Sequence, residues 1–358
     1  PKGVCVSHAN LIANCRAVVD HERPVAVTWL PQHHDMGLIG YYIYIALSGG
    51  TTYGLSPRAF VQNPSIWLEL LSRHKATATS VPNFALEICL NPRRVPDDAL
   101  SRYDLSALRF LMVAAEPVHP ATFEAFRNRF ALCGLSREAL FVAFGLAEFT
   151  LAVTSYGRGV LSVDRRALAL GKVVPVTQTH RVAHAVPIMS CGRPLGDTDL
   201  RIVDPETRIE VEAGHSGEIW VSGSGLTQGY WNKPDQSRAT FGATLVGSDT
   251  RQPFLRTGDI GFVQDTELFV CGRLKDMIII RGRNIYAEDI EACVRQSCPD
   301  LRGNAVVAFA SSEDQAESLT VVAEVARGRD LPDGDEIIRT LRERLQVHIE
   351  RLVFVAPR

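Results

Sequence analysis

The sequence predicts a mixed α/β fold with a large α/β body, a smaller β-rich part and a final α+β segment. In the first half, helical apolar spacing alternates with short buried apolar runs, and from Arg201 onward short β-rich runs are separated by Gly, Pro, Asn and Asp. The length of 358 residues favours about two domains. Apolar residues make up 46% and charged residues 22%, which is ordinary for a globular protein.

Two helices of the first half are marked by a proline in the first turn and by apolar spacing. Asn63 and Pro64 precede one helix, and Pro120 begins the other. The runs 108–113 and 140–143 are short and apolar, as expected of buried parallel strands in βαβ units. The loops at the carboxyl ends of such strands are expected to form a ligand crevice.

The second half is predicted to contain short strands at 201–204, 218–222 and 268–271, in a barrel or a small sheet. A boundary is expected near Lys275, so the sequence predicts domains at 1–274 and 275–358. In the last segment, strands are expected at 304–310, 319–325 and 352–355. An amphipathic helix there carries Ile337, Ile338, Leu341 and Leu345.

Composition excludes several classes of protein. The formal charge is -2 and the pI is about 6.6, so no chain-wide positive field attracts nucleic acid or an anionic membrane. The apolar run 41–47 is too short to span a bilayer, and the first residues carry no targeting signal. Eight scattered cysteines without a Cys-x-x-Cys pair indicate reduced thiols. We therefore expect a cytoplasmic protein.

Two familiar enzyme motifs are missing from the sequence. The glycines at 223, 225 and 229 miss the dinucleotide-binding spacing by one residue, and no strand–loop–helix of suitable length surrounds them. There is also no Gly-x-Ser-x-Gly sequence of a serine hydrolase. A nicotinamide site and a serine nucleophile are both rejected.

Polar residues gather at two further places near the start. Pro1-Lys2-Gly3 matches the downstream edge of a phosphate-binding loop, although the same three residues can form a simple turn. The loop 30–37 contains His33, His34 and Asp35, which suggests a site. A metal centre there needs a third ligand at suitable spacing, whereas capping and loop hydrogen bonds would use the same side chains.

Two carboxylates follow predicted buried strands. Glu116 lies after 108–113 and Glu148 after 140–143, each beside small residues. If a nucleotide phosphate binds here, Mg²⁺ can bridge Glu148 to phosphate oxygens, and the small residues let the backbone approach a flat base. The alternative is an ordinary transition from strand to loop.

A further carboxylate and arginine lie in the β-rich half. The run 256–259 ends on Asp259, which suits vicinal hydroxyls, and the run 272–276 contains Arg273, which suits ribose or phosphate oxygens. The alternative is a pair of surface turns joined by ion pairs.

In this order the motifs resemble the adenylate-forming superfamily of acyl-CoA synthetases, adenylation domains and luciferases. The motifs are Pro1-Lys2-Gly3, His34 with Gly37, 144–148, Gly217-Glu218 with Gly229-Tyr230, 256–259 and 272–276. Within that superfamily, six segments are most similar in sequence to fatty acyl-AMP ligases. They are 30–40, 82–85, 115–118, 145–148, 190–194 and 281–286. Acyl-CoA ligases usually have Thr at the position of Ala147, and the resemblance implies that residues 155–188 correspond to the insertion that marks acyl-AMP ligases.

The resemblance implies the adenylate-forming fold, with a large N-terminal domain of packed α/β sheets, a small β-barrel subdomain and a small α+β C-terminal lobe. It implies that ATP and a long-chain fatty acid give acyl-AMP and pyrophosphate. The acyl group then passes to the phosphopantetheine thiol of an acyl carrier protein, or of a carrier domain of a polyketide synthase or peptide synthetase. An acyl-CoA ligase and an inactive nucleotide- or acyl-binding fragment remain as alternatives.

The resemblance also implies roles for individual residues. In that family a phosphate loop precedes the position of Pro1 and a catalytic lysine follows that of Arg358, so a segment truncated at both ends is expected. The implied catalytic group comprises Lys2 near pyrophosphate, His34 beside the α-phosphate or acyl carboxylate, Glu148 as the Mg²⁺ ligand and Lys275 as the hinge. The implied nucleotide-binding group comprises Ala115, Glu116, Phe144 and Gly145 near adenine, with Asp259 and Arg273 on the ribose.

Overall fold

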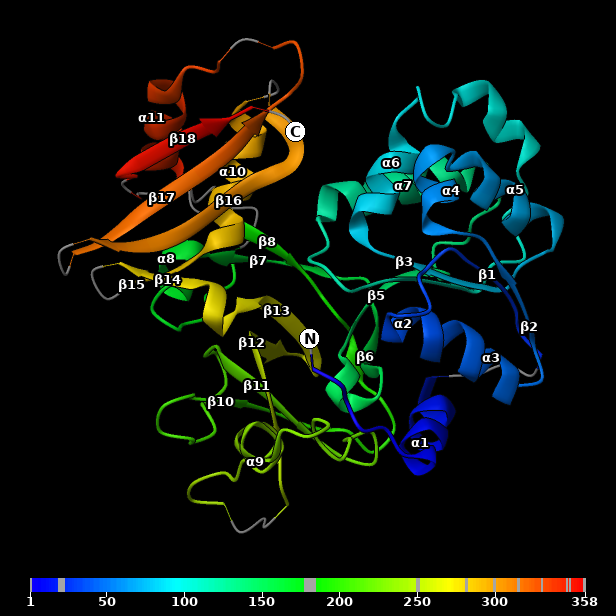
Figure 1. The fold of residues 1–358 in the computed structure, drawn as a ribbon, viewed down its shortest axis with the longest axis horizontal. Coiled ribbons are helices and arrows are strands. Elements are labelled where there is room, and N and C mark those ends of the chain that lie inside the picture. The colour runs from blue at the N-terminus through cyan, green and yellow to red at the C-terminus, as the bar shows by residue number, and fades with distance from the viewer. Residues whose placement is uncertain are drawn as a thin grey trace.

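The computed structural model describes residues 2–18, 23–176, 185–248, 252–280, 283–298, 301–313, 316–329, 331–345, 347 and 349–356. Figure 1 shows a large sheet with helices on both sides, a four-stranded sheet below it, and a third part with α10 and α11. The N-terminal end lies between the large sheet and the four-stranded sheet (Figure 1). Among the described residues, no helix is long and apolar enough to cross a membrane.

The large sheet has seven strands in the order β2-β1-β3-β4-β5-β6-β9. The pairings from β2 to β5 are parallel, and β6 pairs antiparallel with both β5 and β9. The strands are β1 (Val25–Thr28), β2 (Thr51–Gly54), β3 (Ala78–Val81), β4 (Phe110–Val113), β5 (Leu140–Gly145), β6 (Ala152–Gly157) and β9 (Arg193–Pro194). The two predicted buried strands, β4 and β5, are confirmed as parallel neighbours.

Helices cover both faces of this sheet, with α4–α7 on one side and α1–α3 on the other (Figure 1). They are α1 (His8–Val18), α2 (Asp35–Gly37), the π-helix η1 (Leu38–Ile43), α3 (Tyr44–Leu47), α4 (Pro57–Gln62), α5 (Ser65–Arg73), α6 (Asn83–Leu90), the 3₁₀-helix η2 (Asp97–Arg102) and α7 (Pro120–Ala131). Both helices predicted from proline and apolar spacing, α5 and α7, are formed. Their apolar faces are buried against the sheet through Trp67 and Phe126, both 0% exposed.

The β-rich half forms a four-stranded antiparallel sheet in the order β10-β11-β12-β13. Its strands are β10 (Asp199–Val203), β11 (Gly217–Ser222), β12 (Leu255–Gln264) and β13 (Glu267–Arg273). The hairpin of β7 (Val160–Asp164) and β8 (Ala185–Met189), the helices α8 (Arg165–Leu168) and α9 (Pro234–Phe241), and η3 (Ala147–Phe149) complete this region. The predicted insertion 155–188 contains β7 and α8, and its residues 177–184 lie outside the described residues.

The last part has its own apolar core, centred on Ile290, Val321 and Leu341. It contains η4 (Leu274–Asp276), β14 (Met277–Ile280), β15 (Arg283–Tyr286), α10 (Ala287–Ser297), β16 (Leu301–Glu313), β17 (Ala316–Val325), α11 (Gly334–Leu345) and β18 (Arg351–Val355). The three strands predicted in this segment form one sheet in the order β16-β17-β18. The predicted amphipathic helix is α11. The motif residues 281 and 282 lie outside the described residues.

Candidate nucleotide site

The loops after β3, β4 and β5 meet at one edge of the large sheet. Glu116, after β4, accepts a hydrogen bond from the backbone N–H of Phe84 at the start of α6. The Asn83 side chain accepts a second hydrogen bond, from the His119 N–H at 3.1 Å. Burial is the main cause that raises the pKa of Glu116 above its ordinary value. A partly buried carboxyl group therefore lies at the carboxyl ends of the strands, where the sequence predicts a ligand crevice.

Two residues of this edge have restricted backbones. Ala115 has φ of +73°, in the left-handed region that residues with a Cβ rarely adopt. A Cβ added to Gly145 would lie 1.9 Å from the carbonyl oxygen of Leu151, so only glycine fits. Phe144 lies beside Gly145 in β5 and is half-buried. The predicted adenine-binding residues thus lie just after β4 and at the end of β5.

Glu148 and Lys2 are joined through Tyr230, a residue to which the sequence analysis gave no role. The Tyr230 hydroxyl donates a 2.6 Å hydrogen bond to Glu148 Oε1. The Lys2 ammonium lies 4.4 Å from the centroid of the Tyr230 ring, in a cation–π contact. Backbone pairing holds this arrangement, because Val4 forms a β-bridge with Tyr230 and the Trp231 N–H donates to the Gly3 carbonyl at 2.8 Å. Two motifs about 145 residues apart thereby share one site.

Asp259 and Arg273 face each other across β12 and β13. They are cross-strand partners, and Arg273 Nε donates to Asp259 Oδ1 at 3.1 Å. Asp259 is only 7% exposed, whereas the Arg273 side chain is 60% exposed. The predicted pairing of a carboxylate with an arginine is therefore present, with the carboxylate inside and the cation toward solvent.

The pKa of Asp259 connects this pair to Glu148. Burial raises the pKa of Asp259 to about 6, the Arg273 cation opposes the rise, and the negative charges of Glu148 and Asp276 add to it. Glu148 and Asp259 are thus close enough for their charges to interact. The structure therefore joins Lys2 to Glu148 through Tyr230 and joins Asp259 to Arg273, and the charge of Glu148 contributes to the raised pKa of Asp259.

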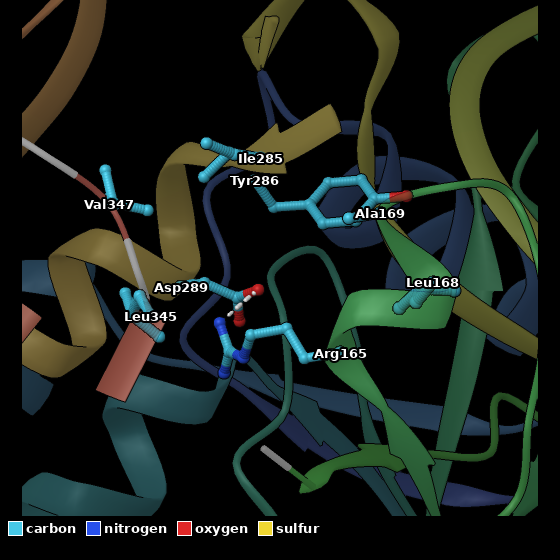
Figure 2. Close-up of a pocket in the computed structure, with 8 residues that line it drawn as sticks. All are labelled: Arg165, Leu168, Ala169, Ile285, Tyr286, Asp289, Leu345 and Val347. Carbon is cyan, nitrogen blue, oxygen red and sulfur yellow. Dashed lines mark ion pairs between the residues drawn. The ribbon is translucent and has the colours of Figure 1, made fainter. Parts of the chain in front are cut away.

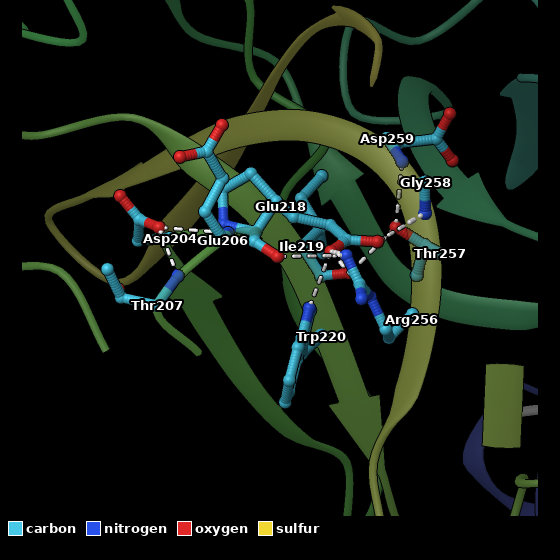
Figure 3. Close-up of polar contacts among 11 residues, drawn as sticks. Asp204, Glu206, Thr207, Glu218, Ile219, Trp220, Arg256, Thr257, Gly258 and Asp259 are labelled. Carbon is cyan, nitrogen blue, oxygen red and sulfur yellow. Dashed lines mark hydrogen bonds and ion pairs between the residues drawn. The ribbon is translucent and has the colours of Figure 1, made fainter. Parts of the chain in front are cut away.

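The strand segment that carries Asp259 is fixed by a buried carboxylate, as Figure 3 shows. Glu218 on β11 is 2% exposed and forms an ion pair with Arg256, whose Nη2 lies 2.7 Å from Glu218 Oε2. The Trp220 indole N–H donates to the same oxygen at 2.9 Å. The motif at 256–259 is therefore part of β12 and is not a surface turn. Gly217-Glu218 was recognised in the sequence, but its contact with Arg256 depends on strand register.

His34 and Lys275 lie at the borders of this arrangement. His34 caps α2, where its Nδ1 accepts the Met36 N–H at 3.2 Å and lies 2.6 Å from Asp35 Oδ1. When Nδ1 is protonated it donates to Asp35 instead, and this hydrogen bond raises the pKa of His34. The capping alternative for this loop is thus observed. Lys275 is exposed in η4, two residues after Arg273. Within the described ranges, neither residue has a hydrogen bond to Glu148 or Asp259.

The donor groups can be compared with what Mg²⁺ requires. No cluster of three or more His, Cys, Asp and Glu side chains that could hold a metal exists among the described residues. Mg²⁺ beside a nucleotide commonly uses one or two carboxylates and takes its other ligands from phosphate and water. Glu148 fits that pattern, because it is a single carboxylate oriented by Tyr230 and lies near Lys2.

A second polar contact lies between α8 and the C-terminal part. Arg165 of α8 forms an ion pair with Asp289 of α10, with Arg165 Nη1 2.6 Å from Asp289 Oδ2. Figure 2 shows this pair in a pocket beside Tyr286 and Leu168. Burial raises the pKa of Asp289, and the Arg165 cation opposes that rise. This pair joins the two parts of the molecule away from the candidate nucleotide site.

The sheet, whose strands from β2 to β5 run parallel, places the chain in the class of open α/β proteins, which bind ligands at the carboxyl ends of their strands. A family model described as AMP-binding enzyme matches residues 1–231. The chain therefore belongs to the AMP-binding enzyme family.

Similar proteins agree with this assignment. The chain is 40% identical over 352 residues to the medium-chain-fatty-acid–[acyl-carrier-protein] ligase JamA of Moorena producens, covering 96% of this chain and 59% of JamA. It is 37% identical over 380 residues to the 4-hydroxyphenylalkanoate adenylyltransferase of Mycobacterium tuberculosis, covering 100% of this chain and 60% of the relative. The chain thus spans about three fifths of the length of these relatives.

Solved structures show the same fold. The Legionella pneumophila fatty acyl-adenylate ligase, in complex with acyl adenylate and pyrophosphate, is 34% identical, with a TM-score of 0.72 over 99% of this chain and 64% of that one. A structure from a study of fatty acyl-adenylate ligases of Escherichia coli and L. pneumophila has a TM-score of 0.84 at 28% identity, over 100% of this chain and 64% of that one. The predicted adenylate-forming fold and the resemblance to fatty acyl-AMP ligases are confirmed.

Proposed function

We propose that this chain supplies the nucleotide site of a fatty acyl-AMP ligase, which converts a fatty acid and ATP to acyl-adenylate and pyrophosphate. The observation that carries the proposal is the convergence of Lys2, Tyr230 and Glu148 beside Asp259 and Arg273. This arrangement puts a cation and a carboxylate for a polyphosphate next to a carboxylate and a cation for a ribose. The names of JamA and of the L. pneumophila ligase, which describe fatty acid activation, support it.

In the proposed complex, each side chain binds or orients one part of the reactants. Ala115, Glu116, Phe144 and Gly145 border the adenine, because their strand ends let a flat ring approach the backbone. The ribose hydroxyls donate to Asp259, and Arg273 donates to ribose or phosphate oxygens.

The reacting groups need charge stabilisation and no general base. The fatty carboxylate is ionised at neutral pH and attacks the α-phosphorus, so the bond to pyrophosphate breaks. In this proposal Lys2 stabilises the departing negative charge, and His34 interacts with the α-phosphate or the acyl carboxylate. When bound, Mg²⁺ supplies Lewis-acid neutralisation of the phosphate charge, and Glu148 is the residue that would hold it.

The acceptor of the acyl group is proposed to be the phosphopantetheine thiol of a carrier protein or carrier domain. The relative JamA is named an acyl-carrier-protein ligase, which supports a carrier protein over free CoA as the acceptor. We propose Lys275, in η4 at the boundary of the parts 1–274 and 275–358, as the hinge on which the C-terminal part turns. All eight cysteines are free thiols, in keeping with the proposed cytoplasmic location.

The test uses this chain together with any residues that flank it in the whole protein. The protein is incubated with ATP, Mg²⁺ and medium- or long-chain fatty acids, and mass spectrometry follows acyl-AMP, acyl-CoA and acylated holo carrier protein. Acyl-AMP with transfer to the carrier and no acyl-CoA is expected. Efficient formation of acyl-CoA would support the acyl-CoA ligase instead, and no adenylate with any acid would support an inactive binding fragment.

A pair of variants connects the activity to the site. Glu148→Gln is expected to abolish acyl-AMP formation, because the amide cannot supply the negative charge proposed to hold Mg²⁺. Glu343→Gln, the same substitution at an exposed position of α11, is expected to leave it unchanged. Equal activity of the two variants would contradict the role proposed for Glu148.

A further inference from the structure

The strand that carries Asp259 leaves its regular pairing just before that residue. Glu218 of β11 pairs with Ile260, and Trp220 pairs with Arg256. Between these two pairs β11 has one residue, whereas β12 has the three residues 257–259. Gly258, in the middle, has φ of +73°, which glycine adopts readily. Bulges of this kind turn a strand and change the direction in which its side chains point.

The side chain of Glu218 occupies the place where the ladder is interrupted. Its Oε1 accepts the N–H of Gly258 at 3.2 Å, a backbone donor that the bulge has removed from regular pairing. Its Oε2 accepts Arg256 Nε at 2.9 Å and the Trp220 indole N–H at 2.9 Å (Figure 3). A carboxylate that is 2% exposed is thereby paired with a cation and satisfied by hydrogen bonds on both oxygens.

Thr257 continues the connection to Asp259. The Thr257 hydroxyl donates to the Ile219 carbonyl at 2.7 Å and accepts the Asp259 N–H at 3.0 Å. Asp259 then pairs with Arg273 of β13. The backbone on both sides of the Asp259 carboxylate is therefore fixed by β11 and β13, and Glu218 is the charged group of that support.

We propose that Glu218 is a positioning residue that sets the preference of the site for ribose over deoxyribose. By filling the bulge it fixes residues 256–259, and so fixes the point from which Asp259 accepts the two ribose hydroxyls. The inference rests on the proposed function, in which Asp259 binds the ribose. Glu218 itself is only 2% exposed, so the proposed role is to position Asp259 and not to contact the nucleotide.

A merely structural role for Glu218 makes a different prediction. A buried ion pair that only holds β11 to β12 would, when disrupted, lower the stability of the fold without changing the ratio of affinities for two sugars. The ratio of affinities for AMP and 2′,3′-dideoxy-AMP therefore distinguishes positioning from stability. Neither ligand requires Mg²⁺ or turnover, so the readout is independent of catalysis.

The experiment measures both affinities by titration calorimetry in four forms of the protein. Glu218→Gln places an amide N–H group against the N–H groups of Arg256 and Trp220, so these donors lose their acceptor. Thr257→Val removes the hydroxyl that accepts the Asp259 N–H. Ser222→Ala is the matched control, because Ser222 is a 2% exposed residue of β11 whose hydroxyl donates to Pro253 at 2.7 Å, away from the bulge. Thermal unfolding of each form confirms that it is folded at the temperature of the titration.

The unmodified protein is expected to bind AMP more tightly than the dideoxy nucleotide. Glu218→Gln and Thr257→Val are each expected to reduce that preference by about tenfold, the value of one lost hydrogen bond to a charged group. Ser222→Ala is expected to keep the preference while lowering the unfolding temperature. If Glu218→Gln keeps the full preference, or if Ser222→Ala loses it equally, the inference is wrong and the proposed function stands. If the unmodified protein shows no preference, the ribose role of Asp259 fails and the inference fails with it.

Discussion

Asp259→Asn is expected to make the protein more stable at neutral pH. Asp259 is 7% exposed, and its burial, together with the charges of Glu148 and Asp276, raises its pKa from the ordinary 3.8 to about 6. A carboxyl group with a raised pKa in the folded state binds its proton more tightly there than in the unfolded state. Folding is therefore least favourable where Asp259 must be ionised, which is above about pH 6.

The size of the effect follows from the shift in pKa. A rise of about two pKa units corresponds to about 3 kcal/mol of unfolding free energy at pH 7.5, as an upper value. The attraction of Arg273 is already contained in this shift. Asparagine has nearly the same shape and carries no charge, so it removes the cost at all pH values. The advantage of the variant is expected to shrink as pH falls from 6 toward 4, because the native aspartate becomes protonated.

Urea unfolding followed by circular dichroism at pH 7.5 and pH 4.5 measures this difference. Asp98→Asn, the same substitution at an exposed position of η2, is the control and is expected to change the unfolding free energy little at either pH. If Asp259→Asn is no more stable than the unmodified protein at pH 7.5, burial does not destabilise the charged form and the reasoning is refuted.

Three further outcomes are expected. Tyr230→Phe removes the hydrogen bond to Glu148, so the dissociation constant of Mn²⁺ bound with ATP should rise about tenfold. Electron paramagnetic resonance titrations measure this constant, and an unchanged value would contradict the orienting role of Tyr230. Gly145→Ala places a Cβ 1.9 Å from the carbonyl oxygen of Leu151 and should lower the unfolding free energy by about 3 kcal/mol. In the control variant Gly159→Ala the nearest atom is 3.8 Å from the new Cβ, so the loss should be under about 1 kcal/mol. Adenosine, which has no phosphate that titrates near pH 6, should bind about tenfold more weakly at pH 5 than at pH 7.5, because Asp259 with a pKa of about 6 becomes protonated. Asp259→Asn should bind adenosine equally at both pH values, and the same pH dependence in that variant would assign it to another group.

Local sequence signals predicted the elements whose apolar residues repeat with the period of a helix or strand. α5, α7 and α11 were predicted from apolar spacing, and β4 and β5 from short buried runs. The π-helix η1 was missed because its run of apolar residues has no distinctive period. β12 was missed because Gly258 and Asp259 interrupt its alternation at the bulge.

The candidate site was predicted residue by residue, but its internal contacts were not. Lys2, Glu148, Asp259 and Arg273 each belong to a recognisable motif, and Asp259 lies close enough to Glu148 for the charge to shift its pKa. For Tyr230 the sequence showed only that it belongs to a motif, although it contacts both Lys2 and Glu148. Contacts between motifs depend on the register of strands that are distant in sequence, and local patterns do not contain that information.

The carboxylates of the candidate site show why its stability and its proposed function oppose each other. Burial raises the pKa of Asp259 and of Glu116, so each is held in a place where its charged form is disfavoured before any ligand binds. Ribose hydroxyls that donate to Asp259 would stabilise its charge in place of water. In the proposed function, nucleotide binding recovers part of the free energy that Asp259 costs the fold, so the variant that stabilises the free protein should be the one that weakens its complex with nucleotide.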